Sequence, residues 1–159
     1  MRGAAGRAGI RFFVNDDADL ALALSADGVH VGQTDLPVAC VRKAVGPGLM
    51  IGVSARTPDE ALRAEREGAD YLGAGAVFPT FSKPGAPAIG TNGLAAVRSA
   101  VRIPVLAIGG ITPETALQAL DAGADGVAVI SAVVNADDPG AAAAALIRVL
   151  RSARPGGLT

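Results

Sequence analysis

The stretch Val105-Leu106-Ala107-Ile108-Gly109-Gly110-Ile111-Thr112 decides the fold, because it joins an apolar run to a glycine pair and then to a helix start. Apolar residues without polar alternation are typical of a strand that is buried on both faces. Thr112 followed by Pro113 is typical of an N-cap and a first helical position. The stretch therefore predicts one strand–loop–helix unit of a parallel sheet, with backbone N–H groups in the glycine loop that suit an anion.

The same unit recurs along the chain. Short apolar runs predict strands over 10–14, 28–31, 49–53, 70–77, 104–108 and 126–130. Segments with helical spacing predict helices over 18–25, 37–45, 58–67, 91–100, 113–122 and 138–151. Gly68 and Gly123 each stand in a Gly-Ala-Asp motif before a strand, where glycine suits the left-handed end of a helix. Alternating strands and helices predict one α/β domain over residues 1–159.

Polar or glycine residues follow nearly every predicted strand. They are Asn15-Asp16, Gly32-Gln33-Thr34-Asp35, Ser54, the segment from Thr80 to Lys83, Gly109-Gly110 and Ser131. Such convergence favours a barrel mouth, whereas a doubly wound sheet would concentrate polar residues at one switch point. A closed barrel has eight units and this chain has about six, so either two units are missing or the sheet stays open. The loops after the last two strands of a barrel usually hold a phosphate group.

Composition excludes several classes of partner. The chain has 14 basic and 15 acidic residues, 3% aromatic residues and no tryptophan, which argues against a nucleic-acid surface. No apolar run approaches the roughly 18 residues of a membrane span. Cys40 is the only cysteine and cannot form an internal disulfide, which predicts a cytoplasmic location. Its position within a helix, without a histidine nearby, predicts that it belongs to the core.

Seven short motifs follow one another across about residues 10 to 150. They are Phe13-Val14-Asn15-Asp16, Gly28-Val29-His30-Val31-Gly32-Gln33-Thr34-Asp35, Ile51-Gly52-Val53-Ser54, Gly68-Ala69-Asp70-Tyr71-Leu72-Gly73-Ala74-Gly75, Phe78-Pro79-Thr80-Phe81-Ser82-Lys83-Pro84, Ala107-Ile108-Gly109-Gly110-Ile111 and Val129-Ile130-Ser131. In this order they resemble the thiamine-phosphate synthase family. The resemblance implies a TIM (β/α)8 barrel, incomplete here because the first two strands have no counterpart. Residues 1–9 then correspond to the end of a preceding helix, and residues 152–159 are predicted as a flexible C-terminal tail.

The resemblance implies a transferase of thiamine biosynthesis. In the family, hydroxymethylpyrimidine diphosphate is condensed with a thiazole phosphate, and diphosphate leaves. The Gln-x-Arg-x-Lys motif with which the family holds the pyrimidine diphosphate does not occur in this sequence. The absence of an obvious nucleophile or base fits such chemistry, which depends on charge stabilisation and alignment.

Two aspartates are the candidate ligands of Mg²⁺. The resemblance assigns Asp16 and Asp35 to the metal, and carboxylates with a substrate diphosphate suit this ion. Spacing alone favours helix capping, since each aspartate stands just before a predicted helix. For the pyrimidine diphosphate, the resemblance implies contacts from Asn15, Ser54 and Lys83, the last two as the catalytic residues.

The thiazole phosphate has its own implied contacts. They are Thr80, Ser82, Gly110, Ile130 and Ser131, although glycine at a barrel end can equally serve tight packing. His30, the only histidine, lies inside an apolar strand and is predicted as a satisfied core residue without a catalytic role. Tyr71 is predicted to pack within its strand.

Two other functions remain open from the sequence. One is a related thiazole tautomerase, in which a histidine acts from the loop where this chain has Ala76. The other is a non-catalytic remnant that binds phosphate ligands. With six strands, residues 10–14 and 126–130 would form unpaired apolar edges, so self-association through these edges is predicted.

Overall fold

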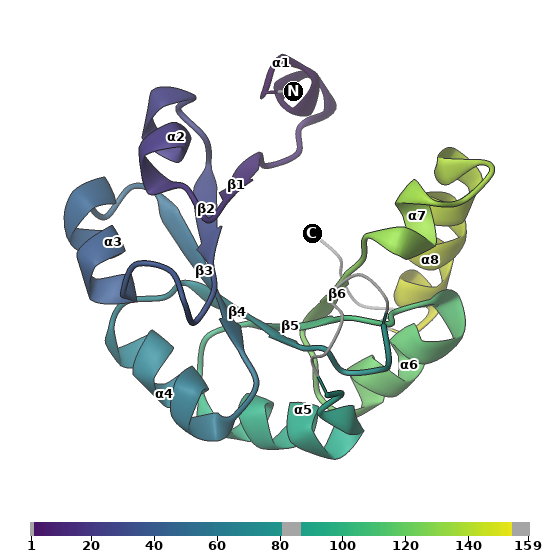
Figure 1. Cartoon of the computed structure of the whole chain (residues 1–159). Coiled ribbons are helices and arrows are strands. Elements are labelled where there is room, and N and C mark those ends of the chain that lie inside the picture. The colour runs from purple at the N-terminus through teal and green to yellow at the C-terminus, as the bar shows by residue number, and fades with distance from the viewer. Residues whose placement is uncertain (1, 81–86, 154–159) are drawn as a thin grey trace.

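The computed structural model describes residues 2–80 and 87–153. Six parallel strands form one sheet whose spatial order follows the chain: β1 (Phe13–Asn15), β2 (Gly28–Val31), β3 (Met50–Ala55), β4 (Tyr71–Gly75), β5 (Val105–Ile108) and β6 (Gly126–Ala128). Figure 1 shows the sheet curved into a half-barrel with helices on its outer side. Among the described strands, β1 and β6 are the two edges, so the sheet is open, and the predicted incomplete barrel is confirmed.

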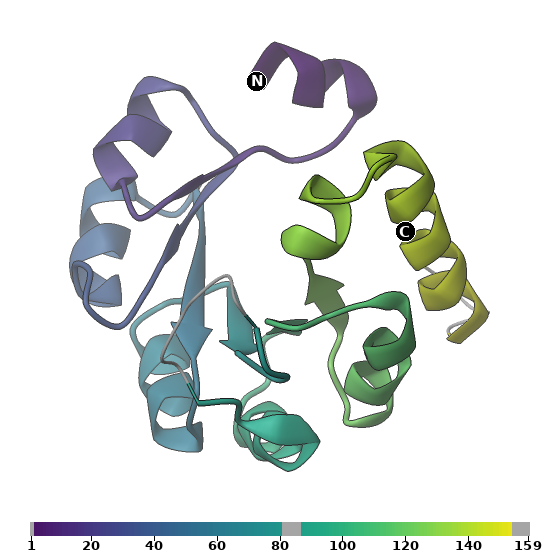
Figure 2. The same cartoon turned by 45° about the vertical axis from the view of Figure 1, so that its right-hand side comes forward.

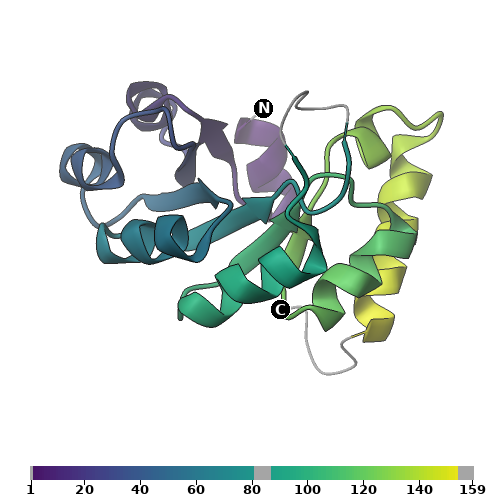
Figure 3. The same ribbon diagram turned by 60° about the horizontal axis from the view of Figure 1, so that its bottom comes forward.

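A helix follows each strand on the outer face. These helices are α2 (Ala18–Ala23), α3 (Val38–Val45), α4 (Pro58–Arg66), α5 (Gly90–Ala100), α6 (Pro113–Asp121), and after the last strand α7 (Ser131–Val134) and α8 (Pro139–Ala153). Figure 3 shows α4, α5 and α6 in front of the strands. Helix α1 (Arg2–Ala8) occupies the predicted helical segment at the start and lies at the open side of the half-barrel (Figure 2).

The predicted elements are present, with changed ends. The strand predicted over 70–77 ends at Gly75, and the strand predicted over 126–130 ends at Ala128 because the chain turns into α7, which was not predicted. Helix α8 continues to Ala153, two residues into the predicted tail, and residues 154–159 lie outside the described part. Cys40 was predicted as a core residue, which is wrong: it is exposed on α3, because that helix buries Val38 and Val41.

Helix ends follow the expected capping chemistry. The side chain of Thr112 accepts from Thr115 N, and the side chain of Thr115 accepts from Thr112 N, which forms a reciprocal capping box. Thr57 caps α4 in the same position by accepting from Glu60 N. Gly68 and Gly123 have φ of +99° and +98°, as a left-handed helix end requires.

The aspartate before a strand connects that strand to its neighbour. In three units its backbone N–H donates to a carbonyl of the preceding strand segment, and its Oδ2 accepts the N–H of the same residue at 2.7–2.8 Å. The pairs are Asp27 with Phe12, Asp70 with Ile51, and Asp125 with Val105. This repeated reciprocal pair aligns neighbouring strands, so their carboxyl ends meet at one edge of the sheet.

The core lies between the sheet and the outer helices. Val29, Ile51, Leu72 and Val105 on adjacent strands are fully buried, and alanines on α4 and α6 let the helices approach closely. No charged or polar residue is buried among the described residues. None of the described helices has both the length and the apolar character of a membrane span.

Candidate active site

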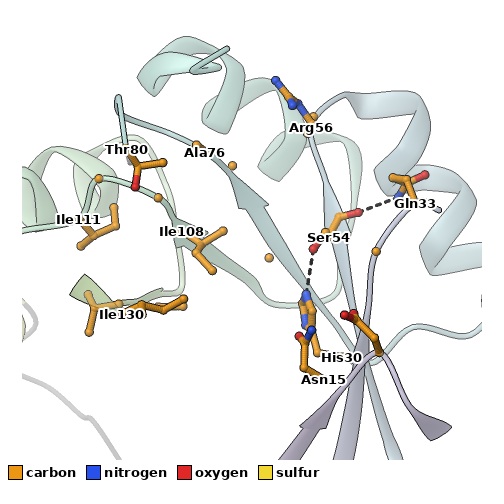
Figure 4. Close-up of a pocket in the computed structure, with 18 of the residues that line it drawn as sticks. Asn15, His30, Gln33, Ser54, Arg56, Ala76, Thr80, Ile108, Ile111 and Ile130 are labelled. Atoms are coloured by element: carbon orange, nitrogen blue, oxygen red, sulfur yellow. Dashed lines mark hydrogen bonds between the residues drawn. The ribbon is translucent and has the colours of Figure 1, made fainter. Parts of the chain in front are cut away.

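A cavity of about 420 Å³ opens at the carboxyl ends of the strands. Eight of the ten residues predicted for the site line it: Asn15, Asp16, Asp35, Ser54, Thr80, Gly110, Ile130 and Ser131. The other two, Ser82 and Lys83, lie outside the described residues. In Figure 4, Asn15, His30 and Ser54 stand on one side of the cavity, and Thr80, Ile108 and Ile130 stand on the other. The volume is within the range of small-molecule sites.

The glycine pair after β5 brings two loops together. Gly109 and Gly110 have φ of +90° and +66°, a region that side chains with a Cβ rarely adopt. A Cβ on Gly110 would lie 2.6 Å from the carbonyl oxygen of Pro79 and 2.7 Å from Cβ of Phe78. Phe78 N donates to Gly109 O at 3.0 Å across the same junction. Tight packing therefore requires glycine here, and the pair also forms part of the cavity wall.

The loop after the neighbouring strand β6 contributes Ile130 and Ser131. Ile130 is the N-cap residue of the short helix α7, and its carbonyl accepts from Val134 N at 2.8 Å. The Ile130 side chain is 58% exposed, although it is large and apolar. The turn into α7 thus directs this segment toward the cavity instead of extending β6.

The two candidate metal ligands line one cavity, and neither caps its helix as the spacing suggested. Asp17, one residue later than expected, caps α2 by accepting from Leu20 N at 2.8 Å. Asp16 itself has φ of +65°, and its backbone N donates to His30 O at 2.7 Å. Asp35 Oδ2 accepts from Gly32 N at 2.7 Å, while Pro37 occupies the N-cap position of α3.

The donor set around these aspartates fits Mg²⁺. Within residues 2–80 and 87–153, no group of three or more histidine, cysteine, aspartate or glutamate side chains could hold a metal. Two carboxylates, with phosphate oxygens supplied by a substrate, are a usual environment for Mg²⁺, which dehydrates reluctantly. Asp35 would offer its Oδ1, since Oδ2 is engaged by Gly32.

His30 belongs to the cavity wall rather than to the apolar core. Its Nε2 lies 3.0 Å from Ser54 Oγ, and its Nδ1 lies 3.1 Å from the hydroxyl oxygen of Tyr71. Two glycines leave the space that the side chains of His30 and Tyr71 occupy. A Cβ on Gly52 would lie 2.1 Å from Cζ of Tyr71, and one on Gly73 would lie 3.2 Å from Cε1 of His30. The prediction of a satisfied histidine is confirmed by these two partners, but its placement in the core is wrong.

Tyr71 packs as predicted and also makes a polar contact. Its ring meets that of Phe13 edge to face, with centroids 5.7 Å apart. Burial raises the pKa of the Tyr71 hydroxyl, because the phenolate would lose hydration. A phenol is already protonated at neutral pH, and this shift extends the protonated range of the hydroxyl beside His30 to higher pH.

Two residues of the cavity wall received no role from the sequence. Gln33 donates through Nε2 to Ser54 O at 2.6 Å (Figure 4), and Arg56 donates through Nη2 to Pro87 O at 2.6 Å. Arg56 is the only arginine or lysine among the described lining residues. In the sequence, only the position of each residue just after a strand could have indicated a role at the site. Glutamine and arginine in loops are usually only solvated, so position alone was not enough.

Known proteins resemble this chain along most of its length. The sequence profile of the family described as thiamine monophosphate synthase matches residues 1–133. Thiamine-phosphate synthase of Moorella thermoacetica is 55% identical over 149 residues, covering 92% of this chain and 70% of that protein. The same-named protein of Methanocella arvoryzae is 52% identical, covering 99% of this chain and 74% of that protein.

A solved structure agrees with the sequence relatives. Thiamine phosphate pyrophosphorylase from Pyrococcus furiosus superimposes with a TM-score of 0.88 at 43% identity, covering 96% of this chain and 73% of that chain. The relatives are transferases, which confirms at family level the function and enzyme class that the motifs predicted. The chain belongs to the thiamine monophosphate synthase family.

Proposed function

We propose that this chain binds a thiazole phosphate and a pyrimidine diphosphate side by side and joins them into thiamine phosphate. The observation that carries the proposal is the single cavity lined by eight of the ten predicted residues, which come from loops after several different strands. Residues from both predicted substrate sites share this one space, as the joining of two substrates requires.

The thiazole phosphate is assigned to the side of the cavity that β5 and β6 form. Gly110 follows β5, Ile130 and Ser131 follow β6, and Thr80 comes from the loop after β4. Phosphate oxygens suit backbone N–H groups and a hydroxyl, and the exposed Ile130 side chain offers apolar surface to a ring. Ser82 stays a predicted contact of this substrate.

The pyrimidine diphosphate is assigned to the side that β1, β2 and β3 form. Asn15 would contact the pyrimidine, and Ser54 would contact the diphosphate. Asp16 and Asp35 would hold Mg²⁺, which supplies positive charge to the departing diphosphate. Lys83 stays the predicted second cation for that charge.

In the reaction, the bond between the pyrimidine methylene carbon and the diphosphate oxygen breaks, and the electron pair leaves with diphosphate. The thiazole nitrogen then gives its lone pair to the methylene carbon. The chain's own part is to align the two substrates and stabilise the leaving charge, with the Ser54 hydroxyl donating to it. Ala76 lines the cavity and carries no group that could move a proton, which counts against a tautomerase.

Among the described strands, β1 and β6 each have a partner strand on one side only, and exposed Ile10 and Val134 lie near them in the sequence, so we infer that chains self-associate at these edges. A cytoplasmic location agrees with a single cysteine.

Calorimetry with each substrate analogue, followed by an assay for thiamine phosphate, tests the proposal. We expect saturable binding of the thiazole phosphate, weakened in Ser131→Ala, and product formation that requires Mg²⁺. The exposed Ser99→Ala on α5 is the matched control. Binding without turnover would favour the non-catalytic remnant, and no binding of either substrate would refute the assignment of the cavity.

A further inference from the structure

We propose that Gln33 is a positioning residue that holds Ser54 in place at the cavity wall. The inference deepens the proposed function, since it concerns the residue assigned to the diphosphate. Gln33 Nε2 donates to the backbone carbonyl of Ser54 at 2.6 Å, and Arg63 Nη2 donates to Gln33 Oε1 at 2.5 Å. The amide of Gln33 therefore joins the first turn after β2 to the end of β3, and α4 restrains it from outside.

Ser54 is held from two sides by this arrangement. Gln33 engages its carbonyl, and His30 Nε2 lies 3.0 Å from its hydroxyl. Residues Ser54 and Ala55 are the last of β3, where the ladder to β4 ends. Gln33 thus sets the direction of the Cα–Cβ bond of Ser54 by fixing its backbone, and His30 selects the rotamer of the hydroxyl.

The orientation of the Gln33 amide follows from its partners. Arg63 can only donate, so the atom facing it is Oε1, and the atom facing the Ser54 carbonyl is the donor Nε2. Glutamate at this position would keep the acceptor for Arg63 but place an oxygen against the Ser54 carbonyl. Gln33→Glu is thus a nearly isosteric change that removes the inner hydrogen bond and adds a negative charge, whereas Gln33→Leu removes the hydrogen bond without adding charge.

Gln33 and Arg63 are exposed, so their hydrogen bonds add little to stability. An effect of a Gln33 substitution on Ser54 can therefore be distinguished from an effect on folding. We expect Gln33→Leu and Gln33→Glu to keep the helical circular-dichroism signal and the melting temperature of the parent chain. A change in the surroundings of Ser54 in these variants would then reflect a changed orientation of this residue, because the fold is intact.

The imidazole of the single histidine serves as the spectroscopic probe of Ser54. His30 is the only histidine of the chain and lies beside Ser54 Oγ, so its imidazole ¹⁵N signals report the Ser54 hydroxyl without any substrate. We expect Gln33→Leu and Gln33→Glu to move these signals from the parent values toward those of Ser54→Ala. Arg63→Ala should move them less, because it leaves the Nε2 donor in place. Gln118→Leu, an exposed glutamine on α6, is the matched control and should leave them unchanged.

Binding of inorganic diphosphate with Mg²⁺ is the second readout. We expect Gln33→Leu to bind it about 3- to 10-fold more weakly than the parent, as loss of one well-placed hydrogen bond implies, and Gln33→Glu to bind it more weakly still because of its added negative charge. His30 signals that stay at the parent values in both variants, while Ser54→Ala moves them, would overturn the positioning role. Absent diphosphate binding in the parent chain would count against the proposed function alone, because the His30 signals need no ligand.

Discussion

Substitution of Gly110 by alanine tests whether the junction of the β4 and β5 loops requires glycine. The backbone there has φ of +66°, which costs an L-residue about 1–2 kcal/mol. The added methyl would also lie 2.6 Å from Pro79 O and 2.7 Å from Phe78 Cβ. The shifts of neighbouring atoms needed to accommodate this methyl group cost roughly 1–3 kcal/mol more. Alanine also restricts the unfolded chain, which offsets about 0.4–1 kcal/mol. The expected net loss in unfolding free energy is about 1–5 kcal/mol.

Gly90→Ala is the matched control for this prediction. Gly90 has φ of +67°, nearly that of Gly110, and a Cβ there would meet nothing within 4 Å. The control therefore carries a positive φ without the close contacts, and about 1 kcal/mol is expected. Urea unfolding of the parent chain and both variants, followed by circular dichroism, measures the two losses. A Gly110→Ala variant no less stable than Gly90→Ala would refute the claim that packing at this junction excludes a side chain.

Burial raises the pKa of Tyr71, the only tyrosine, above its ordinary 10.0, so its tyrosinate absorbance should appear at higher pH in the folded chain than in urea. Because the folded state then holds its proton longer, stability should fall as pH rises above 10, and Tyr71→Phe should remove that part of the fall. Arg42 donates to three backbone carbonyls and pairs with Asp70, so Arg42→Ala should lower the unfolding free energy by about 2–3 kcal/mol; an unchanged urea midpoint would contradict this. Asp35→Asn should weaken Mg²⁺-dependent diphosphate binding at least tenfold (about 1.4 kcal/mol) in calorimetry, and equal affinity would remove Asp35 from the metal site.

Self-association is expected from the open edges of the sheet. Sedimentation at increasing concentration should show a rising average mass, because β1 and β6 are each paired on one side only within the described part of the chain. A single monomeric boundary at high concentration would contradict this expectation.

The order of the elements could be predicted from local signals. Threonine before proline starts α4 and α6, and glycine before Ala-Asp ends the helices that precede β4 and β6. These signals act within a few residues, so the sequence contains them in full. The aspartate of the Gly-Ala-Asp motif was seen in the sequence, but its reciprocal bonds to the neighbouring strand could not be, because they join residues 15 to 20 positions apart.

The sequence predicted which residues belong to the candidate site, but it did not predict which atoms they contact. Polar groups after parallel strands must meet at one edge, which is why residues as distant as Asn15 and Ser131 were placed in one site. Burial and partners depend on neighbouring strands: Gly52 and Gly73 opened the space in which His30 reaches Ser54, and apolar flanks alone suggested a core histidine.

By itself, the sequence determined the repeated strand–helix units, the signals at their ends and the family, and it predicted eight of the residues that line the cavity. Only the tertiary structure decided that Asp17 rather than Asp16 caps α2, that the chain turns at Ile130 into α7, and that Gln33 reaches the Ser54 carbonyl. The physical reason is the separation along the chain over which each kind of interaction acts. Caps and strand propensity are settled by near neighbours, whereas a side chain's partner across the sheet depends on the register, the curvature and the glycines of other strands.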